Sequence, residues 1–359
     1  MVRRVGALST GRGGRGRLIL IAAAPLAVVA FLGLPDGSYP GPHDRLWEGE
    51  PGSSAPVEQM SVLSYNVEGL PPPARWGRKR YLSRIAEELA TMRRAGKAPQ
   101  VVVLQEAFSD PSPPIAAIAG YRYTASGPTT ADRSAPSTAE ARTLARGARL
   151  TKGEGIGHWL GSGLRIMSDF PIVSVRRMAF PAWMCAGYDC LASKGVLIAW
   201  IAVPGSPQSV AFIDAHLNSM RLVGVPSGRS DQAYALQVAA MRAFVAENVP
   251  PGAPAVFAGD FDTENALRRR LLGDPPLAGA RSAIPAAIAA DDAIAPGDRR
   301  EAAAILSHGV DRLYYRGSPD WPITLDGLSV PFGLRSDGTM LSDHRGFVVR
   351  FAVGRQRAS

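Results

Sequence analysis

The chain has 359 residues, 46% of them hydrophobic and 20% charged, so it is long and apolar enough to bury a sizeable core. Two cysteines and a high apolar content exclude a disulfide scaffold, a fibrous protein and an intrinsically disordered protein. The formal net charge is +9, but five arginines precede Leu34, and subtracting them leaves +4 for the rest. Beyond Leu34 no long basic run suggests a DNA-binding surface.

The first 34 residues carry these five arginines and no acidic residue, and they end in an apolar run from Leu18 to Leu34. A basic segment followed by an apolar run predicts an export signal over residues 1–34. The run is longer than the core of most cleaved signals and close to the length of a spanning helix, so a cleaved peptide and a retained anchor both remain open. We expect an exported protein that is periplasmic, extracellular or tethered to the inner membrane.

Residues 35–56 are rich in Pro, Gly and Ser, which predicts a tether ahead of a folded domain over residues 57–355. Within that domain, the β-rich segment 60–67 predicts a strand that ends before the prolines at 71–73. Apolar residues at helical spacing predict an amphipathic helix over 80–94, and "VVVLQE" at 101–106 predicts a buried strand. Further along, the sequence predicts strands over 210–215, 255–259, 310–315 and 347–353 and a helix over 232–248. This alternation predicts an α/β protein.

Two stretches break the alternation. Residues 125–154 and 263–304 are rich in Ala, Ser, Gly and Pro, and they predict insertions or long loops, where substrate specificity often lies. Cys185 and Cys190 in "CAGYDC" are the only cysteines. In an exported protein we expect them to form a local disulfide, with two separate thiols as the alternative.

Polar side chains follow several of the predicted strands. They are Asn66, Glu106, His216, Asn218, Asp260 and Asp262. Several carboxylates and imidazoles at one edge of a sheet destabilise one another unless a cation or a substrate lies between them. Hard oxygen ligands with few histidines and no thiolate favour Mg²⁺ or Ca²⁺ over Zn²⁺. The sequence therefore predicts a cation-dependent site at this edge.

Seven short motifs resemble those of the endonuclease/exonuclease/phosphatase superfamily, which includes deoxyribonucleases, abasic-site endonucleases, inositol-phosphate phosphatases and bacterial sphingomyelinases. The resemblance runs from about Met60 to Phe351. Its motifs occur in the family's order: "SYNVEGL", "VVVLQEAF", "GSGLRIMSDFPI", "DAHLNS", "AGDFD", "VDRLYY" and "LSDHRGF". The resemblance implies a four-layered α/β sandwich, in which two packed mixed β-sheets are flanked by helices, and a single catalytic domain over residues 57–355.

The resemblance also implies a metal site. Asn66 and Glu106 would hold the cation, with Glu106 as its main carboxylate ligand. Asp343 would contact the metal region directly or through water. Mg²⁺ is the implied ion, with Mn²⁺ and Ca²⁺ as alternatives.

The catalytic groups implied by the resemblance are His216, Asp260, Asp311 and His344. His344 would be the general base, oriented by Asp311, while Asp260 helps to position the nucleophile. His216 would donate to a phosphate oxygen or protonate the leaving group. Such groups suit phosphoester hydrolysis, which needs an aligned water, a proton acceptor and positive charge around the transition state.

Two positions depart from the family pattern. The family usually has Gly-Asp-x-Asn where this chain has Gly259-Asp260-Phe261-Asp262. An ionised carboxylate cannot donate a hydrogen bond to phosphate, so Asp262 must be protonated, bind a metal or point away. A second cation site and a relaxed requirement are both open. Arg312 stands where the family usually has Tyr, and a structural ion pair is the alternative role for Asp311.

The segments "SGLRIMSDFPI" and "CLASKGVL" look most like sphingomyelinases and inositol phosphatases, and we expect Lys194, Asn218 and Asp262 to contact substrate. His158 and Trp159 could form a lip for a lipid headgroup, or Trp159 could simply be packed. We therefore expect a Mg²⁺-dependent phosphodiesterase similar to sphingomyelinase C. Its partner would be a phospholipid rather than nucleic acid, and no obligate protein partner is implied. A secreted deoxyribonuclease-type endonuclease is one alternative, and a catalytically silent surface binding module is another.

Overall fold

The computed structural model describes residues 44–49, 55–109, 111, 113–132, 138–221, 223–273, 275–290 and 292–354. These residues belong to one compact unit. The predicted export segment and most of the predicted tether lie outside the described residues. Among the residues described, no helix has both the length and the apolar character needed to cross a membrane.

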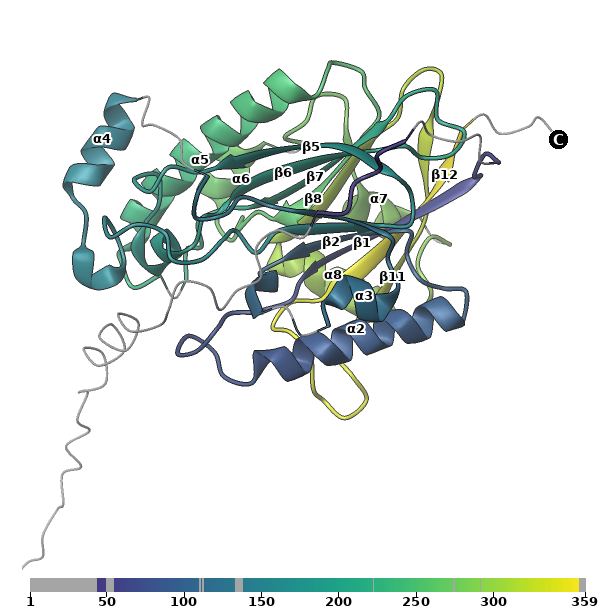
Figure 1. Ribbon diagram of the computed structural model, residues 1–359, viewed down its shortest axis with the longest axis horizontal. Helices are drawn as coiled ribbons and strands as arrows, with labels where there is room; N and C mark the ends of the chain where they lie inside the picture. The colour runs from purple at the N-terminus through teal and green to yellow at the C-terminus, as the bar shows by residue number, and fades with distance from the viewer. Residues whose placement is uncertain are drawn as a thin grey trace, which may run out of the picture. The chain divides into compact units, whose positions relative to one another are not determined.

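Two six-stranded mixed sheets form the centre of the fold (Figure 1). The first sheet has the order β11-β12-β1-β2-β4-β3, and the second has the order β5-β6-β7-β8-β10-β9. The strands of the first sheet are β1 (Gln59–Asn66), β2 (Val101–Gln105), β3 (Tyr123–Ser126), β4 (Arg165–Ser168), β11 (Ile323–Phe332) and β12 (Gly346–Val353). Those of the second are β5 (Ile172–Ala179), β6 (Gly195–Ile201), β7 (Val210–His216), β8 (Ala255–Asp260), β9 (Arg281–Ser282) and β10 (Asp311–Arg316).

Helices flank the two sheets (Figure 1). The α-helices are α2 (Arg78–Arg94), α3 (Ile115–Ala119), α4 (Ala139–Arg146), α5 (Ser227–Asn248), α6 (Ala266–Leu272), α7 (Ala283–Ala289) and α8 (Arg299–His308). Short 3-10 turns are η2 (Ala107–Ser109), η3 (Leu150–Lys152) and η4 (Gly187–Leu191). The predicted four-layered α/β sandwich is thereby confirmed.

Three apolar clusters hold these layers together. The largest lies between the sheets and includes Val62, Val103, Phe212 and Val256. Leu82 and other residues of α2 pack on the outer face of the first sheet, and α5 packs on the outer face of the second. Strands that are covered on both faces are buried along their whole length and mostly apolar, as β2 and β7 are, because neither face meets water.

Most predicted elements are confirmed with small shifts at their ends. The helix predicted over 80–94 begins at Arg78, and the helix predicted over 232–248 begins at Ser227. The disulfide between Cys185 and Cys190 is confirmed. Strands β3 to β6, β9 and β11 were not recognised in the sequence.

The prediction of two long loops was wrong in part. Residues 263–304 contain α6, β9, α7 and the first part of α8, and residues 125–154 contain the end of β3, α4 and η3. α7 buries mainly small side chains, such as Ala283 and Ala287, so its apolar pattern is weak. α7 and α8 pack against β10 of one sheet and β11 of the other.

Strand directions bring the predicted site residues together. β1 runs parallel to β2, and β7 runs parallel to β8, so the four carboxyl ends point to one edge of the sandwich. β10 runs antiparallel to β8, so that its first residue, Asp311, pairs with Asp260. Gly259 permits this arrangement because a Cβ at that position would lie 2.2 Å from the Ala215 carbonyl oxygen on β7.

Candidate active site

Asn66, at the end of β1, links the two sheets at this edge. Its Nδ2 donates to Glu106 Oε1 at 3.1 Å and to Asp260 Oδ2 at 2.9 Å. Its Oδ1 accepts a hydrogen bond from the Glu68 backbone N at 3.0 Å. One amide thus fixes two carboxylates that belong to different sheets, and these carboxylates line one small polar space.

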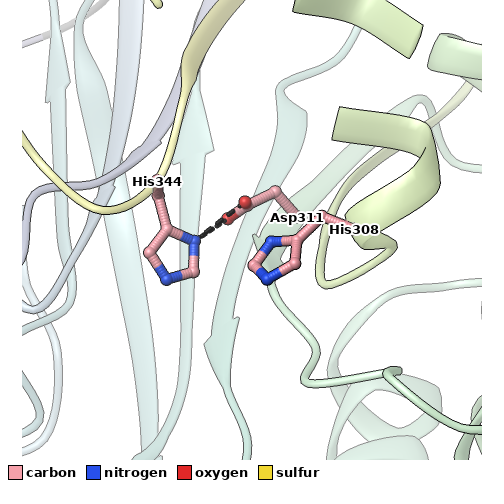
Figure 2. A group of neighbouring side chains, drawn as sticks. All are labelled: His308, Asp311 and His344. Carbon is pink, nitrogen blue, oxygen red and sulfur yellow. Dashed lines mark hydrogen bonds and ion pairs between the residues drawn. The ribbon is translucent and has the colours of Figure 1, made fainter. Parts of the chain in front are cut away.

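His344 and Asp311 form a second unit beside this space (Figure 2). Nδ1 of His344 lies 2.8 Å from Asp311 Oδ2, while Nε2 lies 3.7 Å from Asp260 Oδ2. Burial lowers the pKa of His344, but Asp311 and Asp260 outweigh it, and the net pKa is raised well above the usual value. The carboxylate of Asp311 therefore orients the ring and stabilises its protonated form.

His216, the last residue of β7, lies close to the carboxylates of Glu106, Asp260 and Asp262. Its Nε2 lies 3.9 Å from Glu106 Oε1 and 3.8 Å from both Asp260 Oδ2 and Asp262 Oδ2. Lys194 Nζ is 2.9 Å from the same nitrogen. Burial, with a contribution from Lys194, lowers the pKa of His216 to about 3, so this imidazole is neutral and accepts from the lysine.

Three residues at this edge have left-handed backbones although they are not glycine. Glu68, Glu106 and Asp262 have φ angles of 48°, 56° and 47°, and the described residues contain no other non-glycine residue with positive φ. Such conformations cost on the order of 1 kcal/mol or more each, and they concentrate where function demands a particular side-chain direction. The strain thus marks the same edge as the polar side chains do.

The carboxylates here are short of positive charge. Burial raises the pKa of Glu106 to about 7, although Lys194 and His344 oppose the shift. Burial and the neighbouring Asp260 raise the pKa of Asp262 well above its usual value, and its buried Oδ2 has no hydrogen-bond partner among the described residues. Burial acts to raise the pKa of Asp260, but His344 and His216 outweigh burial and lower this pKa to about 2. Buried oxygen donors that resist ionisation fit a divalent cation, which would supply the missing charge.

Comparison with known protein families decides the assignment. A model of the endonuclease/exonuclease/phosphatase family matches residues 63–344, most of the chain and all of the site just described. The chain belongs to this family. Like other members of the family, the protein is a metal-dependent phosphoester hydrolase.

Solved structures with this family's fold cover most of the chain. Beta toxin from Staphylococcus aureus is 17% identical, with a TM-score of 0.53 and coverage of 81% of this chain and 99% of that one. A beta toxin variant solved with bound magnesium ions is 16% identical, with a TM-score of 0.50 and the same coverage. Sphingomyelinase C from Streptomyces griseocarneus is 21% identical, with a TM-score of 0.49 and coverage of 82% and 99%. A search of curated proteins found no match.

Among the predicted metal ligands, Asn66 and Glu106 lie together, as their family roles require. Asn66 Oδ1 accepts one hydrogen bond and keeps a second lone pair for a cation. Asp343 lies at the rim, where its side chain is half exposed and its Oδ1 is 3.9 Å from His344 Nε2. Its contact with a metal stays a prediction.

The predicted substrate contact of Asn218 has no support in this geometry. The side chain is fully buried, its Oδ1 accepts from the Ala186 backbone, and its Nδ2 donates to Ser219 O and Ser230 Oγ. Asn218 therefore positions the disulfide loop and the segment after β7. Sequence reasoning missed this because a polar residue after a strand can face inward or outward.

Lys194 also differs from the expectation. Its three protons go to Asp189 Oδ2 at 2.9 Å, the Leu217 carbonyl at 2.7 Å and His216 Nε2 at 2.9 Å. In this arrangement no donor of Lys194 remains for phosphate. Direct proton donation by His216, which the resemblance implied, would likewise require Lys194 to move or to supply the proton.

Two further residues of the region escaped the sequence analysis. The Glu68 carboxylate forms ion pairs with Arg75 at 2.7 Å and with Arg78 at 3.4 Å. It also accepts a hydrogen bond from the Asp343 backbone N at 3.2 Å. Asp189, inside the disulfide loop, holds Lys194 and the backbone N of Ser219. The position of Glu68, two residues after Asn66 in the same motif, could have indicated a role at the site. No sequence pattern around Asp189 indicates such a role, because its contact with Lys194 depends on how the disulfide loop folds.

Proposed function

We propose that the protein is an exported, Mg²⁺-dependent phosphodiesterase that cleaves a phospholipid in the manner of a sphingomyelinase C. The observation that carries the choice of substrate is a set of exposed apolar side chains on loops that border the site. Water-exposed aromatic and aliphatic groups beside a polar site suit a substrate presented at a lipid surface. Export is supported by the basic and apolar pattern of residues 1–34.

Trp76 is the most prominent of these side chains, with 76% of its surface exposed. It follows Arg75, whose Nε is 2.7 Å from Glu68 Oε1 and whose Nη2 is 4.0 Å from Asp343 Oδ2. The exposed cations Lys79 and Arg80 begin the next helix. An indole with adjacent cations is the combination that favours the interface between lipid headgroups and acyl chains.

Two other loops at the site carry exposed apolar groups. Tyr188 is 38% exposed and precedes Asp189, which binds Lys194. Leu334 is 47% exposed, and its backbone N donates to Glu301 Oε2, which also accepts from Arg345 next to His344. Each apolar group therefore lies in the same loop as a residue of the site region: Trp76 with Glu68, Tyr188 with Asp189, and Leu334 with His344.

The residues of the site have distinct tasks in this proposal. His344 accepts a proton from the attacking water through Nε2, while Asp311 holds its Nδ1 and stabilises the imidazolium that forms. Asp260, 3.7 Å from that Nε2, orients the water. The Lys194 ammonium carries positive charge to the same space, since its pKa is raised by Asp189, Asp262 and Glu106 although burial acts to lower it.

Mg²⁺ is the cation that the oxygen-rich donor set favours, and a variant of beta toxin with this fold was solved with bound magnesium ions. Asn66 and Glu106 would hold the ion. When bound, the ion would stabilise negative charge on the phosphoryl oxygens in the transition state.

A substrate panel tests the proposal. Sphingomyelin, phosphatidylcholine, phosphoinositides, plasmid DNA and a soluble phosphodiester are each incubated with the protein and Mg²⁺, and again with EDTA. We expect EDTA-sensitive turnover that is highest on a phospholipid and is lost in His344→Ala, which excludes a contaminating hydrolase. Preferential cleavage of plasmid DNA would replace the proposal with a deoxyribonuclease. No EDTA-sensitive turnover on any substrate would overturn it.

A further inference from the structure

His308, the last residue of α8, stands beside the His344–Asp311 pair but belongs to none of the family motifs in this sequence. Its ring centroid lies 5.8 Å from that of His344, with the two planes at 63°. Figure 2 shows the Asp311 carboxylate between the two imidazoles. One ligand atom from each of the three residues can be chosen so that all three atoms lie within 4.8 Å of one another.

Two imidazoles and one carboxylate are a ligand set of a particular kind. Zn²⁺ prefers such mixed nitrogen and oxygen donors in a tetrahedral arrangement, with water in the fourth position. His308 is exposed, so solvent can reach this position. Mg²⁺ prefers six oxygen ligands and suits this set poorly. The cluster therefore differs in metal preference from the oxygen-rich group around Glu106.

The backbones of the three residues are held in place. α8 ends at His308, and it is capped by Gly309, which has a φ of 75° and whose carbonyl accepts a hydrogen bond from Thr263 Oγ1. Asp311 begins β10 and pairs with Asp260 in the ladder. The His344 backbone N donates to Ser342 Oγ at 3.2 Å. Ligand atoms around tetrahedral Zn²⁺ are about 3.4 Å apart, so side-chain rotations alone can close the remaining gap.

We propose that His308, Asp311 and His344 form an inhibitory binding site for Zn²⁺. A zinc ion held there takes a nitrogen of His344 and the carboxylate of Asp311, so the imidazole can no longer be oriented by Asp311 and accept a proton. The binding itself rests only on the geometry of the three side chains. The inhibition rests on the proposed function.

The first experiment measures binding without reference to activity. The full chain is freed of metal with EDTA, the chelator is removed, and Zn²⁺ affinity is measured by competition with a chromophoric chelator in the presence of excess Mg²⁺. We expect His308→Gln to weaken zinc binding at least about tenfold, since even indirect partners of a metal site contribute that much. His158→Gln removes a histidine outside the cluster and is expected to bind as wild type does.

Co²⁺ gives a structural readout of the same site. Bound in place of Zn²⁺, it should give the visible absorption typical of four-coordinate cobalt in the wild type and in His158→Gln, and lose it in His308→Gln. Thermal unfolding of both variants shows whether they are folded. Equal zinc affinity of wild type and His308→Gln would overturn the proposal. Loss of zinc binding in Glu106→Gln but not in His308→Gln would overturn it as well, because the ion would then occupy the oxygen-rich group.

The second experiment measures inhibition on whichever substrate the panel identifies. At saturating Mg²⁺, Zn²⁺ should inhibit the wild type, whereas His308→Gln should keep the basal rate and require at least about tenfold more zinc for the same inhibition. If no substrate is cleaved, the proposed function fails while the binding result still stands. If substrate is cleaved and zinc inhibits both proteins equally, the inhibitory role of this site is wrong.

Discussion

The interaction between His344 and Asp311 is the residue-scale feature on which the proposed chemistry depends most. The carboxylate is 2.8 Å from Nδ1, which leaves Nε2 directed toward Asp260. Asp311 also raises the pKa of His344, because the negative charge stabilises the imidazolium in a buried place. The pair therefore makes His344 a stronger base than a free imidazole.

Asp311→Asn tests this role through pH dependence. Removing the charge removes one of the influences that raise the pKa of His344, so the acid limb of the kcat/KM profile should move to lower pH. The plateau rate should fall by roughly 10²- to 10⁴-fold, since the asparagine no longer favours the productive tautomer and the imidazolium. Rates measured from acid to alkaline pH at saturating Mg²⁺ check both effects. An acid limb that stays in place would show that Asp311 does not set this pKa.

Asp262 is the residue at which the chain departs most clearly from its family. Its Oδ2 is buried without a hydrogen-bond partner in the part of the chain that the structure describes, and burial together with Asp260 raises its pKa well above the usual value. A neutral acid can donate a hydrogen bond as the family's amide does, and so can asparagine. A second cation would instead require the ionised form.

Asp262→Asn separates these two roles. If the carboxyl group acts as a neutral donor, the variant should keep wild-type activity or exceed it at saturating Mg²⁺. Mg²⁺ titrations of the rate check this expectation. A loss of at least about tenfold that excess Mg²⁺ partly restores would instead show that the carboxylate is an essential second metal ligand.

At the scale of elements, Glu154 ties three segments together. Its Oε1 accepts from the Gly187 backbone N and from Arg229 Nε, both at 2.8 Å, and its Oε2 accepts from the Arg149 backbone N at 2.6 Å. These bonds connect the end of η3 and the start of η4 with α5. The disulfide loop that presents Asp189 to Lys194 is therefore fixed at both its covalent link and this carboxylate.

Glu154→Gln tests this anchor through stability. Burial acts to raise the pKa of Glu154, but Arg229 and the two backbone donors outweigh it and lower the pKa. A carboxylate with a lowered folded-state pKa stabilises the protein above its unfolded-state pKa, and this contribution is lost as the pH falls through the folded-state value. We expect the variant to lose about 1–3 kcal/mol of unfolding free energy at pH 7, with the deficit shrinking below pH of about 4. Urea unfolding at several pH values measures it. A deficit independent of pH would rule out an ionic anchor.

At the scale of the whole molecule, three exposed apolar side chains stand on separate loops that also carry residues of the site region. Trp76 lies between β1 and α2, Tyr188 lies in the disulfide loop, and Leu334 lies between β11 and β12. The strand topology brings the predicted site residues to one edge of the sandwich, and under the proposed function a lipid surface that contacts these loops would meet them.

Trp76→Ala tests whether the surface is used. We expect weaker cosedimentation with phospholipid vesicles and roughly tenfold lower turnover of vesicle lipid, since an exposed indole contributes on the order of 1–2 kcal/mol at such an interface. Turnover of a soluble phosphodiester should be unchanged, because Trp76 makes no contact with the catalytic groups in the proposal. Leu46→Ala, on the segment beside β3, removes an exposed apolar side chain elsewhere and should leave both rates unchanged. An equal loss on both substrates would point to damage of the site rather than lost docking.

Local patterns in the sequence were enough to predict the fold class, the family and most of the polar residues that meet at the site. Mostly apolar strands such as β2 and β7 can be predicted from the local sequence pattern. Glu106, His216 and His344 stand in recognisable motifs at the ends of strands. The Ala-rich helices α7 and α8 were missed because small side chains give little periodic contrast, although they pack well once a core exists.

How the polar groups use their hydrogen bonds could not be predicted from the motifs and is seen in the folded chain. The Asn218 side chain faces inward, where it accepts a hydrogen bond from the Ala186 backbone. Lys194 donates its three protons to Asp189, Leu217 and His216. His308, at the end of α8, lies beside His344. The physical reason is that hydrogen-bond partners and burial depend on residues far apart in the chain. Sequence motifs identify which groups can do chemistry, whereas strand order and loop packing determine which of them remain free to do it.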